Sequence, residues 1–222
     1  MAKKEDVVVI QGIKEVRVPI RIVGITPLIV HSWSEKAKKE MLDKQMKKTV
    51  TEARKAKDPF DDFVQSLYWL TEKPEESTPD AFEEAVKNGA KFGFKVGAIK
   101  MAANSAAYRS GWVKNQMGLR GAYFLESEYG EFFEIKDVNT GKPCIPQMRE
   151  DSVKVGMGTA DLRYRGEFVN WYADLMLSYD ESGEFTIEQL MNCINKGGYS
   201  VGIGEWRPEK DGEFGRYRVV AR

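Results

Sequence analysis

The stretch Gly197–Val220, GGYSVGIGEWRPEKDGEFGRYRVV, determines how the end of the chain folds. Within it, the run from Gly202 to Arg207 lacks the third glycine of the GxGxxG nucleotide-binding motif. That motif also needs a helix directly after it, because the helix N-terminus holds the phosphates. Here a strand pattern follows instead. We therefore expect two strands around Pro208–Gly212, that is, a glycine-rich hairpin that closes a sheet.

The segments before this stretch carry the clearest secondary-structure signals. Residues Trp171–Tyr179 alternate strictly between two faces, which predicts a strand. Residues Thr186–Lys196 have the spacing of a helix, with Thr186 and Gln189 as a capping box and Gly197 as the end. A strand, a helix and a glycine-rich hairpin in this order indicate an α+β protein.

The N-terminal half adds a first strand and several helices. The alternating run Val16–Val30 predicts a strand, in which Pro19 favours an edge or a bulge. Further elements are expected at Ser34–Lys57 (helix), Asp58–Leu70 (helix), Thr78–Asn88 (helix), Gly97–Gly111 (helix) and Phe132–Lys136 (strand). The sum is a ferredoxin-like or RRM-like βαββαβ antiparallel sheet. It forms one domain, 1–222, with residues 34–90 as a helical insertion after the first strand.

Composition limits the class of protein. The 222 residues carry 34 basic and 34 acidic side chains, so bulk charge does not point to a polyanionic partner. The two cysteines are far apart, which disfavours a zinc site and fits reduced thiols. The sequence shows no apolar run long enough for a membrane helix, and the run near the start is too short for a secretory signal. We expect a cytoplasmic protein without membrane contact.

Signals for catalysis are weak. His31 is the only histidine, and the sequence contains neither a GxSxG nucleophile motif nor a P-loop. The acidic clusters at Asp58–Asp62 and Glu126–Glu131 suit a helix start and a turn, and nothing beside them favours metal-dependent chemistry. We therefore expect a non-enzymatic protein with no catalytic residue, no metal and no small-molecule cofactor.

A basic segment offers a binding site. Arg163 and Arg165 share one face of an expected strand, and Tyr164, Arg149, Lys154 and the pair Gly156 and Gly158 lie close in sequence. Guanidinium groups beside an aromatic ring suit a phosphate backbone with stacked bases. The alternative is a solvated strand face on which nearby acids pair with the arginines, namely Glu150, Asp161 or Glu167.

The glycine-rich end also supports a resemblance to a known family. Gly202, Gly204, Gly212, Phe214 and Gly215, running into Tyr217 and Val219, resemble the C-terminal glycine-rich loop of the RAMP superfamily. The segment TPLIVHS resembles that family's opening strand. The resemblance implies an RRM-like fold and a nucleic-acid-binding role, as in the RNA-binding backbone subunits of CRISPR effector complexes. The runs IPQMREDSVKVGMGTADLRYRGEF and GIGEWRPEKDGEFGRYRV also resemble an uncharacterised phage and prophage protein family.

Together these observations predict a phage-type protein that binds single-stranded DNA or RNA in the host cytoplasm and assembles along the strand as a homo-oligomer. The alternatives are a structural subunit of a virion or CRISPR-like complex, or an enzyme that processes nucleic acid. Whether the basic helix 34–57 contacts nucleic acid or protein stays open. The expected binding residues are Arg149, Lys154, Arg163, Tyr164, Arg165, Trp206, Arg207, Arg216 and Arg218.

Overall fold

Strand β1 (Glu15–Gly24) shows the expected alternation. The computed structural model describes residues 12–47, 56–155 and 158–221. In it, Ile20 and Ile22 of β1 point into the core, while Arg17 stays exposed. Because successive side chains of a strand face opposite sides, this pattern buries one face of β1. The strand therefore lies on a core with its other face towards solvent.

β1 is an inner strand of the largest sheet. All neighbouring strands in this sheet are antiparallel, and the short strand β7 (Lys136–Asp137) pairs with the first two residues of β10. The spatial order is β11 (Tyr217–Ala221), β1, β10 (Trp171–Asp180) and β5 (Tyr123–Glu126). The expected α+β class with antiparallel sheets is confirmed.

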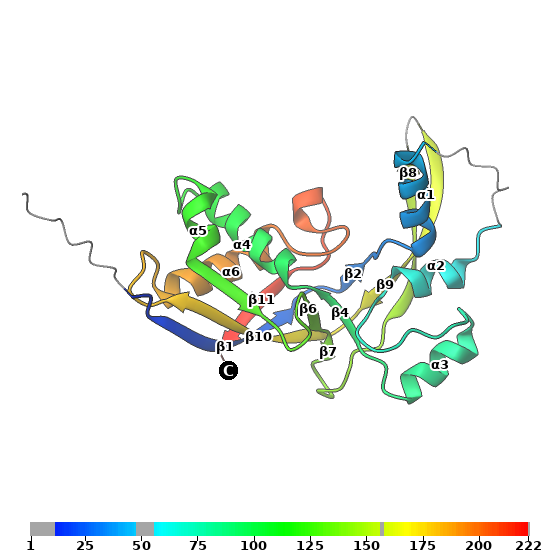
Figure 1. The fold of residues 1–222 in the computed structure, drawn as a ribbon, viewed down its shortest axis with the longest axis horizontal. Helices are drawn as coiled ribbons and strands as arrows, with labels where there is room; N and C mark the ends of the chain where they lie inside the picture. The colour runs from blue at the N-terminus through cyan, green and yellow to red at the C-terminus, as the bar shows by residue number, and fades with distance from the viewer. Residues whose placement is uncertain (1–11, 48–55, 156–157, 222) are drawn as a thin grey trace, which may run out of the picture.

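Two helices cover one face of this sheet. Helix α4 (Val96–Arg109) and helix α6 (Ile187–Ser200) pack against each other, and α6 also packs on β11 (Figure 1). Alanines on α4 allow the two helices to approach closely. The core under the helices includes Ile20, Ile22, Ala103, Ala107, Leu175, Leu177, Ile194 and Tyr217.

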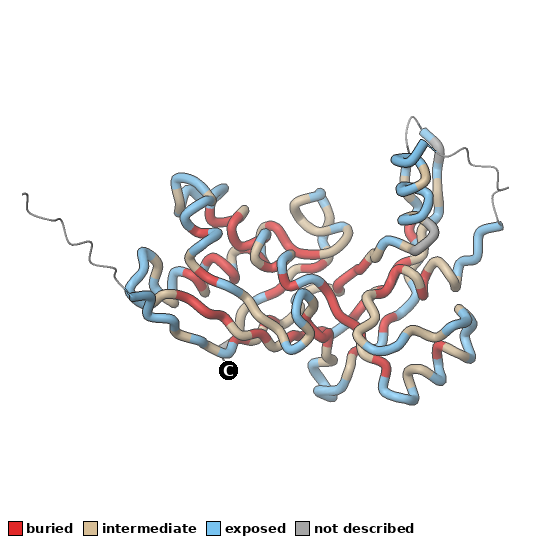
Figure 2. The backbone as a smooth tube through the Cα atoms, in the orientation of Figure 1, coloured by how far each residue is buried: buried red, intermediate tan, exposed pale blue. Residues whose placement is uncertain are grey.

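The remaining elements form a second region beside the main sheet. It holds two smaller sheets, whose orders are β2-β9-β8 and β3-β4-β6. Figure 2 shows that the buried backbone runs continuously from the main sheet into this region, whereas most described residues of α1 are exposed. Helix α5 (Gln116–Ala122) is not part of this region, because it packs on α4 and β5. The elements of the region are β2 (Leu28–Val30), α1 (Glu35–Gln45), α2 (Pro59–Ser66), β3 (Tyr68–Trp69), α3 (Pro79–Lys87), β4 (Phe92–Lys95), β6 (Phe132–Glu134), β8 (Gln147–Val155) and β9 (Thr159–Phe168).

Several expected element boundaries change. The helix expected at Ser34–Lys57 begins as expected but ends at Gln45, with Met46 as its C-cap and a positive φ at Lys47; residues 48–55 lie outside the described part of the chain. The helix expected to reach Leu70 ends at Ser66, since Tyr68 and Trp69 pair with β4 as a strand instead. Their rings pack against Phe94 and Phe92, and this aromatic packing outweighs the helical pattern. The strand expected at 132–136 divides into β6 and β7.

The glycine-rich end differs most from expectation. Helix α6 continues through Gly197 to Ser200, since a Cβ atom at Gly197 would lie 2.6 Å from the Ala103 backbone nitrogen. Gly197 thus permits close helix packing and does not end the helix. Of the expected hairpin, only β11 is a strand. Residues 201–216 form a loop with one 3₁₀ turn at Pro208–Lys210, so the prediction of two strands is wrong.

Pro19 does not mark an edge strand. β1 is paired on both sides, but its pairing with β11 in the described residues begins at Ile20, one position beyond Pro19. A proline, which has no N–H group, is tolerated at that point because no ladder hydrogen bond to β11 is needed there. None of the helices in the described ranges combines the length and the apolar character needed to cross a bilayer.

Candidate functional site

The glycine-rich loop, residues 201–216, docks onto the end of β2 through its backbone. The Glu205 N–H donates to the Ile29 carbonyl at 2.9 Å, and the Gly215 N–H donates to the Pro27 carbonyl at 2.8 Å. Gly204 has a φ of +79°, and a Cβ atom there would overlap the Ile29 carbonyl oxygen. Glycine is therefore required at this position both for its conformation and for the close approach.

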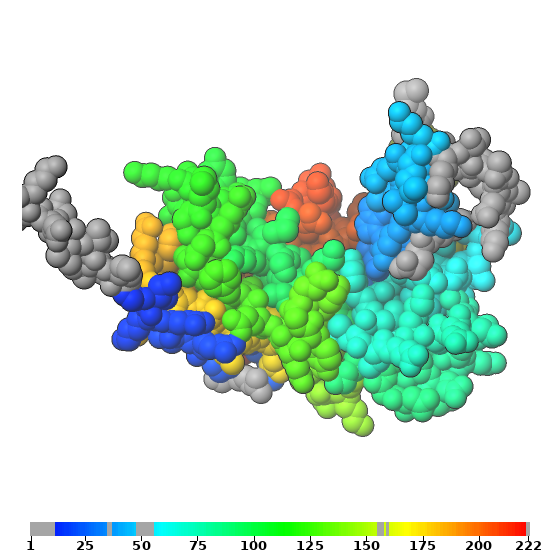
Figure 3. Space-filling model, in the orientation of Figure 1, coloured from blue at the N-terminus to red at the C-terminus, as the bar shows by residue number. Residues whose placement is uncertain are grey.

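A groove of about 790 Å³ separates this loop from α4. Figure 3 shows the loop as an orange projection between the green surface of α4 and α5 and the blue surface of α1. The walls come from the end of β2, from β3 and β4, from α4 and α5, and from the loop. They include His31, Tyr68, Phe94, Gly97, Lys100, Met101, Gln116, Arg120, Gly202, Gly204, Glu205, Arg207 and Glu209.

The groove walls carry three basic side chains. Lys100 donates to the Tyr123 carbonyl at 2.7 Å and lies 4.5 Å from the centroid of the Phe124 ring. Burial lowers the pKa of Lys100. Arg120 donates to Gln116 at 3.1 Å, within the same helix. Lys100 and Arg120 thus reach the groove from two different helices, and within the described residues neither is paired with a carboxylate.

The third basic group, Arg207, is held in the loop. Its guanidinium donates to the Gly204 carbonyl at 3.0 Å and to Glu209 at 2.9 Å. Arg109 also binds Glu209, at 2.7 Å. Burial would raise the pKa of the Glu209 carboxyl, but Arg207 and Arg109 outweigh it and lower that pKa. The groove lining thus sets Lys100, Arg120 and Arg207 against Glu205 and Glu209, which leaves a formal excess of one positive charge.

The first turn of α4 adds to this charge. Gly97 lies in the groove wall, and the N-cap residue Lys95 provides no side-chain cap. The N-terminal end of a helix carries partial positive charge on its exposed N–H groups. Here that end lies beside Lys100, so the positive charges of the helix end and of the lysine reinforce each other.

His31 lines the groove and is partly buried. Burial lowers the pKa of its imidazole, and the charge of Arg165 lowers it further. Its backbone carbonyl accepts a hydrogen bond from the Tyr68 hydroxyl at 3.3 Å. At neutral pH the imidazole is therefore uncharged, and it supplies a neutral polar group to the groove wall.

The β8–β9 hairpin holds five of the expected binding residues, and two of them are engaged inside the protein. Arg149 and Arg165 lie opposite each other, and both bind Asp151 at 2.9 Å. The Arg165 side chain is only 5% exposed and also lies 3.6 Å from Glu205. Arg149 binds Glu167 at 3.1 Å as well. A phosphate group cannot reach Arg165 without displacing these acids, so we correct its assignment as a phosphate contact.

The other three hairpin residues are more accessible. Arg163 lies 3.5 Å from Asp161. This is one of the ion pairs that we expect if the strand face is simply solvated. Tyr164 is partly buried against the core, with the Lys57 ammonium 6.0 Å from its ring centroid. Lys154 is exposed towards the end of the hairpin. Gly156 and Met157 lie outside the described residues, so the glycine pair next to these side chains is not described as a whole.

Trp206 has a structural role that the sequence does not indicate. Its φ is +52°, an uncommon conformation for a residue with a side chain. Burial would raise the pKa of the Asp151 carboxyl, but hydrogen bonds from Arg165, Arg149 and Trp206 together lower it. Trp206 therefore links the glycine-rich loop to the hairpin through Asp151. Trp206 is nevertheless 37% exposed, so its expected role in stacking on a base stays a prediction.

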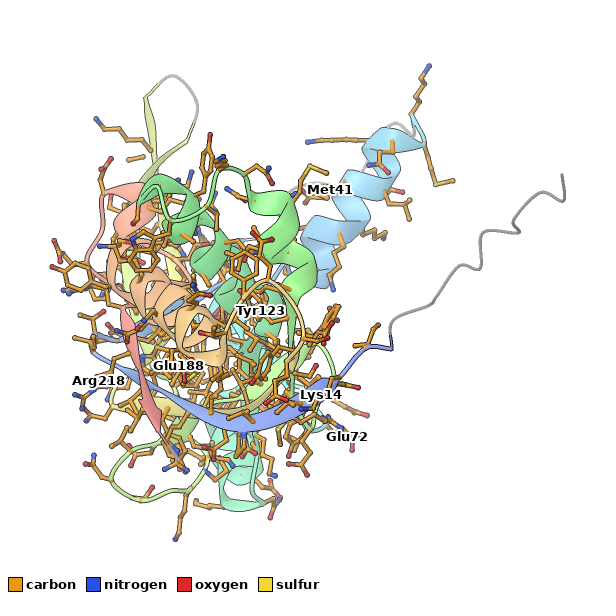
Figure 4. All side chains as sticks on the ribbon, turned by 90° about the vertical axis from the view of Figure 1, so that its left-hand side faces the viewer. Lys14, Met41, Glu72, Tyr123, Glu188 and Arg218 are labelled. Atoms are coloured by element: carbon orange, nitrogen blue, oxygen red, sulfur yellow. The ribbon has the colours of Figure 1, made fainter. Side chains whose placement is uncertain are left out.

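The remaining expected residues do not converge on one surface. Arg207 lines the groove. Arg216 lies 4.9 Å from the centroid of the Tyr199 ring, on the side of α6. Arg218 is exposed on β11, and Figure 4 shows it projecting outward beside the sheet. The structure thus separates the predicted set into a hairpin cluster, the loop residues Trp206 and Arg207, and the more distant Arg216 and Arg218.

The sequence interpretation did not find Lys100, Met101, Gln116 and Arg120. The sequence did contain a signal for Lys100 and Met101, because both lie outside the row of small buried residues on α4. Helix α5, which carries Gln116 and Arg120, has too few residues for a clear helical period. Its position beside α4 follows from tertiary packing alone.

Comparison with known proteins adds no assignment. No family model matches the chain, and no curated protein matches it either. The resemblance to RAMP proteins and to phage proteins therefore stays a prediction. Within residues 12–47, 56–155 and 158–221, no group of three or more histidine, cysteine or acidic side chains is placed to hold a metal ion.

The Asp151 network leads to a prediction about stability. We expect Asp151→Asn to lower the free energy of unfolding by about 3 kcal/mol at neutral pH, because Arg165 stays buried without its main carboxylate. The pKa of Asp151 is lower in the folded than in the unfolded chain. The contribution of the ionised carboxylate to the free energy of unfolding is therefore complete above about pH 4, and it is lost as the pH falls through the folded-state pKa.

Urea unfolding at neutral pH and near pH 3 measures this effect. The difference between wild type and Asp151→Asn should shrink in acid. Glu150→Gln, on the exposed face of the same hairpin, serves as the control and should change stability by less than about 1 kcal/mol. A difference for Asp151→Asn that is equally large at both pH values would contradict the role of the ionised carboxylate.

Proposed function

We propose that the chain is a single-stranded nucleic-acid-binding protein that holds the strand in the groove between α4 and the glycine-rich loop. The proposal includes a ferredoxin-like arrangement of the main sheet. Its support is the series β1, α4, β5, β10, α6, β11, which gives a βαββαβ order with the strands arranged β11-β1-β10-β5. In this description, residues 25–95 and 127–170 are insertions into a four-stranded core.

The observation that carries the proposal is the combination of basic and apolar groups in one groove. Lys100, Arg120 and Arg207 line it together with the rings of Tyr68 and Phe94. Proteins that bind single strands combine a positively charged groove for the backbone with side chains on which bases stack. Hydrogen bonds from the Glu205 and Gly215 N–H groups to Ile29 and Pro27 hold this loop wall in position.

The exposed side chains beside the groove favour a single strand over a duplex. Met101 and Trp112 lie on the solvent side of α4 and directly after it, and both are exposed. Unpaired bases offer flat faces for such contacts, whereas the bases of a duplex are already stacked and paired. Double-stranded nucleic acid of the same length should therefore bind more weakly.

Binding is tested by titrating fluorescent single-stranded DNA and RNA oligomers with the wild-type protein at about 50 and 200 mM salt. Three phosphate contacts correspond to a slope of about −2 in log K against log salt. We expect the affinity to fall roughly twentyfold between the two salt concentrations. If neither oligomer binds at low salt, the proposal is wrong. Equal affinity for a duplex would contradict the single-strand preference.

A further inference from the structure

The groove between α4 and the glycine-rich loop contains, among the described residues, two carboxylates that differ in how far their oxygens are occupied. Glu209 accepts hydrogen bonds from the Arg207 guanidinium at 3.1 and 2.9 Å and from Arg109 at 2.7 Å. In the described part of the chain no hydrogen bond reaches the Glu205 carboxylate, and its side chain is 43% exposed. Glu205 is therefore the groove acid whose oxygens are open to a ligand.

Glu205 is held in place by its backbone and by one buried arginine. Its N–H donates to the Ile29 carbonyl at 2.9 Å. The Arg165 guanidinium lies 3.6 Å from one Glu205 oxygen, just beyond hydrogen-bond distance, and is itself bound to Asp151 at 2.9 Å. An ionised carboxylate has about four acceptor positions, so this single long contact fixes the side and leaves most of them unused.

An aromatic ring and an imidazole line the groove together with this carboxylate, namely Tyr68 and His31. Burial raises the pKa of the Tyr68 hydroxyl, and the charge of Glu205 raises it further. The same charge opposes the lowering of the His31 pKa, so the three side chains are close in space. The Tyr68 ring is held by Phe94 and Phe132, whose centroids lie 5.5 and 5.6 Å away. It therefore offers a fixed face on which a base can stack.

The chemistry of a carboxylate decides which part of a strand it can contact. An ionised carboxylate only accepts hydrogen bonds, so it repels phosphates and selects donors. Unstacked bases of a single strand are read on their Watson–Crick edges. Guanine presents two adjacent donors there, the N1–H and the N2 amino group, which match the two oxygens of one carboxylate. Adenine and cytosine place one amino group beside an acceptor nitrogen, and uracil and thymine place one N–H between two carbonyl oxygens.

We propose that Glu205 is a specificity-determining residue that selects guanine within the bound strand. Its two oxygens accept hydrogen bonds from the N1–H and the N2 amino group, and the Tyr68 ring stacks on the base. The inference rests on the proposed function, because the strand must first be held in the groove. Lys100, Arg120 and Arg207 hold the backbone without regard to sequence, and Glu205 adds a preference for one base.

The experiment titrates wild type with fluorescent oligouridylate of about ten nucleotides and with the same oligomer carrying one central guanine, inosine, adenine or cytosine. The guanine oligomer should bind at least about fivefold more tightly than the uridine, adenine and cytosine oligomers. Adenine controls for the stronger stacking of a purine. Inosine keeps the N1–H but lacks the N2 amino group, so its oligomer should fall between those of guanine and uridine. The deoxy series should show the same order, because the Watson–Crick edge is the same.

Glu205→Gln should abolish the guanine preference and leave oligouridylate binding nearly unchanged, because an amide has only one acceptor oxygen. Glu213→Gln removes the same charge from an exposed position of the same loop outside the groove and should keep the preference. Circular dichroism verifies that both variants are folded. An equal loss for every oligomer in Glu205→Gln would indicate a structural role and contradict the inference.

The wild-type series separates this inference from the proposed function. Binding of all oligomers with equal affinity would overturn the selection of guanine and leave single-strand binding in place. If no oligomer binds, both proposals are wrong. A guanine preference that persists in Glu205→Gln would show that another group reads the base, and would overturn the role of this carboxylate.

Discussion

Replacing Gly198 by alanine should lower the free energy of unfolding by about 2 to 3 kcal/mol, although alanine favours a helix more than glycine does. Gly198 lies in α6 where the helix crosses β11. A Cβ atom there would overlap the Tyr217 carbonyl oxygen and would lie 2.5 Å from a carbon of the Tyr217 ring. Tyr217 is fully buried, so it has no free space into which to move. The helix must therefore lift from the sheet.

The control is the same substitution in another helix. Gly121 of α5 is exposed, and a Cβ atom there would meet nothing within 4 Å. Gly121→Ala should therefore be neutral or stabilise the protein by up to about 1 kcal/mol. Urea unfolding followed by circular dichroism measures both variants. If the free energies of unfolding of the two alanine variants differ by less than about 0.5 kcal/mol, α6 does not pack on β11 as closely as the structure shows.

Changing two basic residues of the groove should have the largest effect on binding. We expect Lys100→Gln combined with Arg120→Glu to weaken single-strand binding at least about tenfold, or about 1.4 kcal/mol. The two side chains are proposed to hold separate phosphates, so their loss should also reduce the salt slope by about 1.4. Glutamine at position 100 keeps a donor for the Tyr123 carbonyl, which preserves the local fold.

The sequence predicted local features better than tertiary ones. The capping box of Thr186 and Gln189 forms as expected, and so does the N-cap of α3, where the Thr78 hydroxyl accepts from Ala81. Both depend only on residues three positions apart. The alternation of β1 and β10 is also confirmed, since it follows from one buried face. Such features need no knowledge of the partner element.

The same rules failed where distant segments meet. Gly197 has the sequence context of a helix end, yet the helix continues because its lack of a side chain lets α6 approach α4. Arg165 has the context of an exposed strand residue, yet Glu205 of the distant loop and Asp151 enclose it. A local pattern cannot indicate that a charged side chain is buried when its partner comes from a loop forty positions later.

The candidate groove could be predicted only in part. The glycines of the loop and Arg207 were recognisable as one wall. The opposite wall comes from α4 and α5, about a hundred positions earlier in the chain, and nothing in the sequence joins those helices to the loop. The close packing of α4 on α6 brings them together. Lys100 and Arg120 therefore became candidates only once the packing was known.

The location of the binding site is tested most directly by comparing two matched double variants in the single-strand titration. Lys100→Gln with Arg120→Glu changes the groove. Lys142→Gln with Arg218→Glu makes the same changes at exposed positions outside it. We predict that the dissociation constant of the groove variant is at least about tenfold higher than that of the control variant, which should bind nearly as wild type. Equal dissociation constants for the two folded variants, or a greater loss for the control, would contradict binding in the groove.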